Sequence, residues 1–180
     1  MTGELRGKRV AILATDGVER CELEVPRGAL YGAGATSDLV SPHDGEIQAR
    51  QMDMVSAGTL AVDRTLAIAV AADYDALLLP GGTVNPDTLR VVEDAIEFVR
   101  SFVSTGRPIG AICHGPWTLL EAGAVDGRRM TSWPSLRTDL RCGGAEWVDE
   151  QVVVDGPLTT SRSPSDLPAF CAAIVEQFAK

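Results

Sequence analysis

Short apolar runs alternate with amphipathic stretches along the chain, and this alternation is the feature that most restricts its fold. Buried strands are predicted at residues 10–14, 37–41, 75–79 and 109–112, because each run is short and apolar. Longer stretches with helical spacing lie between them. The alternation predicts parallel strands joined by helical crossovers, and therefore an α/β fold with a mostly parallel central sheet. We expect one domain over residues 1–180, a length that allows a sizeable core.

The helical stretches are predicted at residues 21–33, 89–104 and 166–178, the last with Ser165 or Asp166 as its N-cap. Residues 46–54 are predicted to form a small hairpin or another short segment outside the main sheet, with Gly45 and Gly58 breaking the chain on either side of it. Residues 147–148 and 151–154 are predicted to form a strand pair. In open parallel sheets, ligands bind beyond the carboxyl ends of the strands. The segments that follow the predicted strands are therefore expected to converge on one site.

One of these segments places a cysteine in a sharp turn from strand to helix. Residues 109–112 end in Cys113, and Gly115 and Pro116 precede a helix predicted at residues 117–121. The order small-x-Cys-x-Gly corresponds to a nucleophile elbow built around a cysteine. A helix N-terminus beyond the sulfur is expected to favour the thiolate. Most cysteines are inert apolar residues, but the neighbouring glycine, proline and histidine favour a nucleophile here.

The first predicted helix carries an acidic residue on its inward face. Helical spacing places Glu22 on the stripe that packs on the sheet, whereas Glu24 lies on the opposite, solvated face. A buried carboxyl group must be hydrogen-bonded or protonated. Glu22 is therefore a candidate site residue, although it could also be an acid that stabilises the start of its helix. Glu19, one turn earlier, is a second candidate in a position that is more easily solvated.

Two further groups follow strand ends. Gly81 and Gly82 come after the strand at residues 75–79, where the backbone of a glycine can approach a ligand closely. The N–H groups of Gly82 and His114 are expected to form an oxyanion hole facing the Cys113 sulfur, although the glycines could also serve only to turn the chain. A direct proton relay between the adjacent residues Cys113 and His114 is not assured by spacing, and a third group must orient the imidazole.

Charge and cysteine usage exclude several classes of function. The formal net charge of −9 argues against nucleic acid or anionic membrane as partner. The four cysteines are far apart, with no Cys-x-x-Cys pair, which fits neither a metal site nor a disulfide framework. No signal-like or membrane-spanning apolar run is found. These features predict a cytoplasmic protein without metal or cofactor, whose partners are small molecules, peptides or a second copy of the chain.

The motifs together resemble the ThiJ/PfpI superfamily, and specifically the group of PfpI-type intracellular proteases and general stress proteins. The resemblance runs through nearly the whole chain, in the segments at residues 16–26, 76–82, 111–116, 131–134 and 146–149. The Ile-Cys-His-Gly-Pro element with an upstream Leu-Pro-Gly-Gly is its most specific part. The resemblance implies a flavodoxin-like three-layer sandwich, with Cys113 as a reactive cysteine on strained backbone.

The resemblance also implies roles for individual residues. Glu22 corresponds to a buried, protonated glutamic acid that donates a hydrogen bond to the cysteine sulfur. Asp87 corresponds to the acid that orients the histidine from a neighbouring subunit, where the family often has glutamate. From this sequence alone, Asp87 also fits an acid in the first turn of a helix. Trp133 replaces a tyrosine that often lines the pocket, so the size and polarity of the pocket are expected to differ.

These observations predict a homodimer or higher homo-oligomer that acts in stress response through Cys113. The main hypothesis is a cysteine-dependent hydrolase, glyoxalase or deglycase acting on small carbonyl adducts, with Cys113 as nucleophile and His114 transferring protons. One alternative is a redox sensor or holding chaperone in which Cys113 is oxidised to a sulfinate held by Glu22. A second alternative is an intracellular cysteine peptidase.

Overall fold

The computed structural model describes residues 4–180 and confirms the α/β fold with a mostly parallel sheet. Seven strands form the central sheet in the order β11, β12, β8, β7, β1, β3, β6, and only the β11–β12 pair among the described strands of this sheet is antiparallel. Their bounds are β1 Arg9–Leu13, β3 Thr36–Ser41, β6 Arg64–Thr65, β7 Ala76–Leu79, β8 Ile109–Ile112, β11 Val152–Asp155 and β12 Leu158–Ser161.

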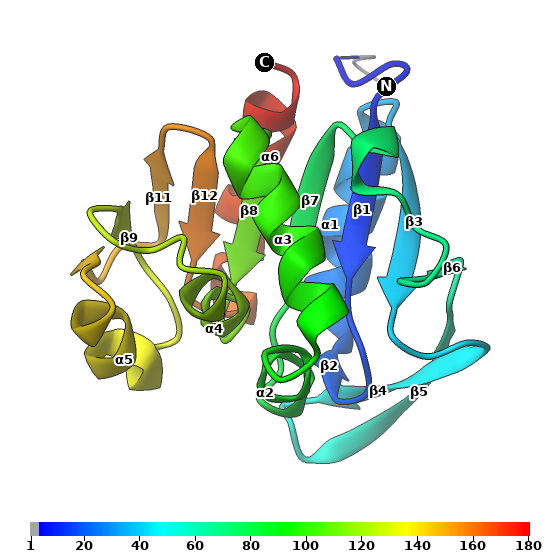
Figure 1. Ribbon diagram of the computed structural model, residues 1–180, viewed down its shortest axis with the longest axis horizontal. Helices are drawn as coiled ribbons and strands as arrows, with labels where there is room; N and C mark the ends of the chain where they lie inside the picture. The colour runs from blue at the N-terminus through cyan, green and yellow to red at the C-terminus, as the bar shows by residue number, and fades with distance from the viewer. Residues whose placement is uncertain (1–3) are drawn as a thin grey trace.

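Helices cover both faces of this sheet. Their bounds are α1 Arg20–Gly32, α2 Val84–Leu89, α3 Glu93–Thr105, α4 Pro116–Glu121, α5 Arg137–Cys142 and α6 Leu167–Phe178. The helices α1 and α6 lie behind the sheet and α3 lies in front of it (Figure 1). Two separate cores result, one built around Phe98 and Phe102 of α3 and the other around Leu23, Leu30 and Phe170 of α1 and α6. The protein is a three-layer sandwich, as the family resemblance implied.

Two small sheets flank the carboxyl ends of the central strands. Strand β2 (Val18–Glu19) pairs with β4 (Glu46–Gln51), which forms a hairpin with β5 (Val55–Ala61). On the other side, β9 (Arg129–Met130) pairs with β10 (Glu146–Trp147). Short 3-10 turns are η1 Ala71–Asp73, η2 Pro134–Leu136 and η3 Pro164–Asp166. The carboxyl ends of β1, β7 and β8 point to the same edge of the sheet, next to the β4–β5 hairpin and α2 (Figure 1). No helix within residues 4–180 combines the length and apolarity needed to cross a bilayer.

The structure corrects two predicted elements in the first half of the chain. The helix predicted at 89–104 begins later, at Glu93 of α3, because Leu89 ends α2 and the extended backbone of Val92 separates the two helices. Two consecutive β-branched residues, Val91 and Val92, favour that extended geometry. The hairpin is longer than predicted, because Gly58 lies inside β5 and does not interrupt the strand. Its backbone has φ of +80°, which glycine adopts without a steric penalty.

Near the C-terminus, one predicted strand pairing is wrong and one strand was missed. The segments at 147–148 and 151–154 do not pair with each other, because Trp147 pairs with β9 and β11 pairs with β12. Strand β12 has a polar sequence, Leu-Thr-Thr-Ser, yet all four residues are buried, so apolar patterning missed it. Asp166 does occupy the N-cap position of α6, as one of the two predicted residues. Its side chain makes no cap hydrogen bond, however, and forms an ion pair with Arg162.

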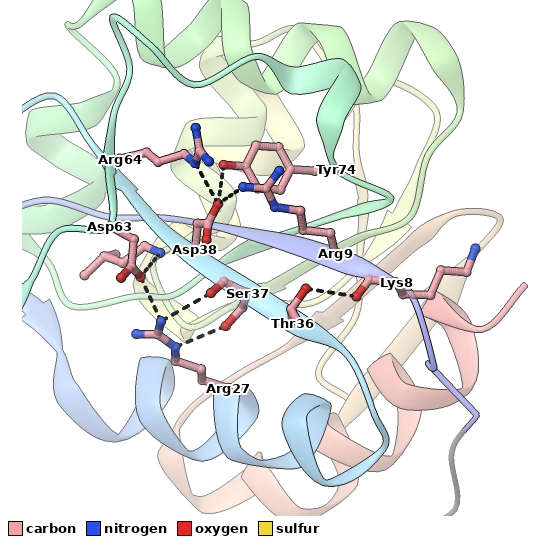
Figure 2. A network of polar contacts seen from close by, with 10 residues as sticks. Lys8, Arg9, Arg27, Thr36, Ser37, Asp38, Asp63, Arg64 and Tyr74 are labelled. Carbon is pink, nitrogen blue, oxygen red and sulfur yellow. Dashed lines mark hydrogen bonds and ion pairs between the residues drawn. The ribbon is translucent and has the colours of Figure 1, made fainter.

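Polar side chains gather around β3, next to the short edge strand β6 (Figure 2). Asp38 accepts hydrogen bonds from Arg9, Arg64 and the Tyr74 hydroxyl. Burial opposes ionisation of Asp38, but these hydrogen bonds hold the pKa of its carboxyl below the usual range. Next to it, the Leu39 N–H donates to Asp63 at 2.7 Å and Arg27 donates to the Ser37 carbonyl. An edge whose backbone groups are paired in this way is a poor template for another strand.

Candidate active site

Cys113 lies in the tight turn between β8 and α4, as the sequence predicted. It is one of three non-glycine residues with positive φ in the described chain, at +61°. Such a conformation costs on the order of 1–3 kcal/mol and persists only where the surroundings impose it. Gly115 allows the turn, because a Cβ at this position would lie 2.4 Å from the Leu79 carbonyl oxygen. Cys113 is 6% exposed and therefore largely buried.

The glycine pair after β7 lies directly against this turn. A Cβ on Gly81 would lie 2.4 Å from Glu22 Oε2 and 2.7 Å from Cys113 Cβ. Only glycine therefore allows the approach of these three segments. Gly82 has φ of +80°, and its backbone N–H and that of His114 act to lower the pKa of the Cys113 thiol. The structure brings together the two backbone donors that we predicted for an oxyanion hole.

Asn85, which the sequence analysis missed, holds the glycine turn in place. It is fully buried in α2, and its Oδ1 accepts a hydrogen bond from the Thr15 N–H at 2.8 Å. Its Nδ2 donates to the carbonyl oxygens of Pro80 and Gly81 at 3.0 and 3.1 Å. One amide side chain therefore connects the end of β1 to the turn after β7. The Asn-Pro dipeptide before Asp87 was visible in the sequence, but nothing in its spacing indicated burial.

Glu22 is fully buried on α1, on the inward stripe where helical spacing placed it. Its Oε2 accepts a hydrogen bond from the Gly81 N–H at 3.0 Å. Its Oε1 is buried without a nitrogen or oxygen partner, and the carboxyl group contacts the Cys113 thiol. Burial raises the pKa of Glu22 to about 8. The group is therefore mostly protonated at neutral pH, a state in which it donates a hydrogen bond to the sulfur.

Opposing effects act on the Cys113 thiol. Burial raises its pKa, and an ionised Glu22 would raise it further. A protonated Glu22 acts in the opposite direction, because it donates to the thiolate and adds no negative charge. The sequence analysis attributed thiolate stabilisation to the following helix, but α4 has only six residues. In the structure, the backbone N–H groups of Gly82 and His114 oppose the effect of burial and lower the pKa of the thiol. A protonated Glu22 would act in the same direction as these N–H groups.

The His114 ring faces the sulfur. Its Nδ1 lies 3.3 Å from Cys113 Sγ, so the two adjacent side chains do meet within one chain. Its Nε2 lies 3.4 Å from the Ser135 hydroxyl, and the ring stacks on Trp133 at a centroid distance of 5.9 Å. Burial lowers the pKa of His114, while the negative charge of Asp53 raises it. The structure places Trp133 beside His114, and the contact of the ring with Ser135 was not foreseen.

The β4–β5 hairpin closes another side of the site. Glu19 is buried, not solvated as its position suggested, and accepts hydrogen bonds from the Cys21 thiol and the Asp53 N–H. Asp53 accepts hydrogen bonds from the N–H and hydroxyl of Thr83 at 2.6 and 2.8 Å. Asp53 has φ of +60° at the hairpin turn. These contacts fix the hairpin tip against the N-terminus of α2 and place two carboxylates beside the glycine turn.

Asp87 is the candidate that the chain does not bring to the site. It lies exposed on α2, and its carboxylate makes no hydrogen bond or ion pair within residues 4–180.

All four cysteines are free. Burial raises the pKa of Cys21 to about 12 and that of Cys171 to about 11, while Cys142 is exposed.

Residues 8–177 match the model of the DJ-1/PfpI family, and the chain belongs to this family. General stress protein 18 of Bacillus subtilis is 37% identical over 166 residues, which cover 91% of this chain and 94% of that protein. Protein/nucleic acid deglycase 2 of Escherichia coli is 38% identical over 164 residues, covering 91% and 93%. An uncharacterised protein of Archaeoglobus fulgidus is 50% identical over 104 residues, which span 58% of this chain and 61% of that protein.

The fold comparison agrees with this assignment. A two-domain protein of Anabaena variabilis contains a DJ-1/ThiJ/PfpI-like domain and a ferritin-like domain. Its crystal structure matches this chain with a TM-score of 0.86 and 33% identity over 94% of the chain. The chain spans about half of that longer protein, 48% of its length. The comparison confirms the three-layer α/β sandwich.

Proposed function

We propose that this protein is a stress-response enzyme in which Cys113 attacks the carbonyl carbon of small carbonyl compounds and their adducts. The observation that carries the proposal is the 3.3 Å contact between Cys113 Sγ and His114 Nδ1 on a strained turn, with backbone donors at the sulfur. A nucleophile beside a base, with donors for developing negative charge, is the arrangement used for covalent catalysis at carbonyl groups. The deglycase and general stress protein names of two relatives support this choice.

The chemistry can be followed on methylglyoxal. As the sulfur adds to the aldehyde carbon, the thiol proton moves to His114 Nδ1 and the carbonyl π electrons move to oxygen, where the N–H groups of Gly82 and His114 stabilise the charge. Return of the proton to that oxygen gives a hemithioacetal. Transfer of the hydrogen on the first carbon to the second carbon, and of the hydroxyl proton from the first oxygen to the second, gives a thioester of lactate. Water then hydrolyses the thioester, which frees the thiol, so the overall reaction adds one water and needs no external oxidant.

Turnover of methylglyoxal by the purified, reduced protein tests the proposal. We expect the substrate to disappear with formation of an equal amount of lactate, at a rate proportional to protein concentration. Glycated peptides provide a second substrate, from which the free amine should be released. If the protein neither forms lactate from methylglyoxal nor releases amine from the glycated peptide, the proposed enzyme activity is contradicted.

A redox role is the second candidate, and the buried carboxyl of Glu22 favours it. A neutral carboxyl in contact with Cys113 is placed to donate a hydrogen bond to an oxygen of a cysteine sulfinate. All four cysteines are free, which fits action in a reducing compartment such as the cytoplasm. If mild peroxide gives a stable Cys113 sulfinate and the protein turns over no carbonyl substrate, the redox role replaces the enzyme.

We further propose that the protein forms a homodimer through the surface around α2 and the hairpin tip. Exposed apolar side chains gather there on two segments joined by the contacts between Asp53 and Thr83, namely Met52, Met54 and Val84. Clustered apolar exposure beside a site is typical of an interaction surface. Light scattering at micromolar concentration should give twice the chain mass. Met54→Asp should shift the protein toward the monomer, and a monomeric wild-type protein would contradict the proposal.

A further inference from the structure

The imidazole of His114 has a partner on each ring nitrogen within a single chain. Nδ1 faces Cys113 Sγ at 3.3 Å, and Nε2 faces Ser135 Oγ at 3.4 Å. Ser135 lies in the turn η2, on the far side of the ring from the sulfur. A general base needs a third group that holds its ring and tautomer, and the hydroxyl of Ser135 occupies the position of such a group.

The backbone fixes this serine relative to the cysteine. The Trp133 N–H donates to the carbonyl oxygen of Cys113 at 2.9 Å, so the turn that carries Ser135 is held by the elbow itself. The Leu136 N–H donates to the Trp133 carbonyl oxygen, and the Leu136 side chain is fully buried. The Trp133 ring stacks on the imidazole at an interplanar angle of 26°. The turn is therefore anchored on both sides of Ser135.

We propose that Ser135 is a positioning residue that orients His114 for the activation of Cys113, an inference that rests on the proposed function. The Ser135 oxygen accepts the Nε2–H of His114, which leaves the Nδ1 lone pair facing the Cys113 sulfhydryl. When Nδ1 takes the thiol proton, Nε2–H remains bonded to the same oxygen, so one neutral group serves both ionisation states. The acid that the family resemblance implied, Asp87 of a second subunit, is not needed for this task.

A hydroxyl and a carboxylate differ in their effect on the imidazole. A carboxylate at Nε2 would stabilise the imidazolium form, whereas a hydroxyl adds no charge. Asp53 in the hairpin turn acts on His114 as a nearby negative charge, and Arg90 of the adjoining segment lies over the Trp117 ring that contacts the imidazole. Burial outweighs Asp53 and leaves the pKa of His114 lowered. The neutral serine keeps the imidazole available as a base at neutral pH.

Imidazole ¹⁵N NMR tests the orientation of His114 directly. The chain has only two histidines, so in the His43→Gln variant the only imidazole signals come from His114. In that background we expect the wild-type ring to be the Nε2-protonated tautomer at pH 7. Ser135→Ala should give a mixture of tautomers, and Ser135→Thr, which keeps the hydroxyl, should restore the single form. Asp87→Asn should leave the signals unchanged. An unchanged tautomer in Ser135→Ala, or a change in Asp87→Asn instead, would overturn the proposal.

The rate of Cys113 alkylation gives an independent readout that requires no turnover. The net contribution of one hydrogen bond predicts a fall of about 2- to 10-fold in Ser135→Ala at pH 7. Ser135→Thr should restore the rate to within about 2-fold. Ser104→Ala, an exposed serine on α3, is the matched control and should have no effect. An unchanged rate in Ser135→Ala would contradict the positioning role even if the protein turns over carbonyl substrates. A slowed rate in a protein without turnover would contradict the proposed function alone.

Discussion

Replacement of Cys113 by serine is expected to abolish turnover of carbonyl substrates. Serine fits the same turn and has a similar size, so the fold and the contacts of Gly81 should be retained. A hydroxyl is much less acidic than a thiol, so serine forms the reactive anion far less readily at a site built for sulfur. We expect the catalytic rate to fall on the order of 10³-fold or more, as measured by lactate formation from methylglyoxal.

The matched control is Cys142→Ser, because Cys142 is exposed and lies on α5. It should keep full activity. Circular dichroism and thermal unfolding of both variants should resemble those of the wild-type protein. If Cys113→Ser retains activity while Cys142→Ser loses it, the nucleophile has been assigned to the wrong residue.

The second large effect is expected from Glu22→Leu. If the protonated carboxyl donates to the Cys113 sulfur, its loss removes a charge-assisted hydrogen bond to the thiolate. We expect the pKa of the Cys113 thiol to rise by about one to two units, with alkylation near pH 7 slowed about 10- to 100-fold. Glu22→Gln still carries an N–H donor and should have a smaller effect. The measurement is the rate of iodoacetamide alkylation as a function of pH.

Glu24→Leu provides the comparison on the exposed face of the same helix, where Glu24 forms an ion pair with Arg20. It should leave the pH profile unchanged. Faster alkylation in Glu22→Leu would show that the native carboxyl is ionised and repels the thiolate.

The pH dependence of the free energy of unfolding provides a second check on Glu22. The folded protein keeps the Glu22 proton up to a pKa of about 8, above the ordinary value of 4.5. Glu22 therefore makes the fold less stable as pH rises through this window, a slope that Glu22→Gln should remove.

Local pattern was sufficient to predict the elements that are strongly apolar or strongly periodic. The strands that carry the site, β1, β7 and β8, end within one residue of the prediction, and the cysteine turn lies where glycine and proline indicated it. Helical spacing separated Glu22 from Glu24 correctly. These features depend on contacts between residues close in sequence. Strand β12 was missed because its burial is imposed by β8 and α6, not by an apolar sequence.

The remainder of the site depends on contacts that only the folded chain creates. Ser135 reaches His114 because the Trp133 N–H is bonded to the Cys113 carbonyl oxygen, a contact between segments 20 residues apart. Asn85 is a site residue only because α2 turns its amide toward the loop after β7. Glu19 was expected to be solvated, and the β4–β5 hairpin buries it. Neither hydrophobic periodicity nor motif spacing predicts these contacts between segments that are distant in sequence.

The central claim is that the site makes a buried thiol more reactive than an exposed one. Cys113 is 6% exposed, whereas Cys142 lies on the surface, so accessibility alone would direct a small alkylating agent to Cys142. Brief treatment of the reduced protein with substoichiometric iodoacetamide at pH 7, followed by peptide mapping, separates the two cases. Activation by Glu22, His114 and the backbone donors predicts that the label is on Cys113. Preferential labelling of Cys142 would contradict the account.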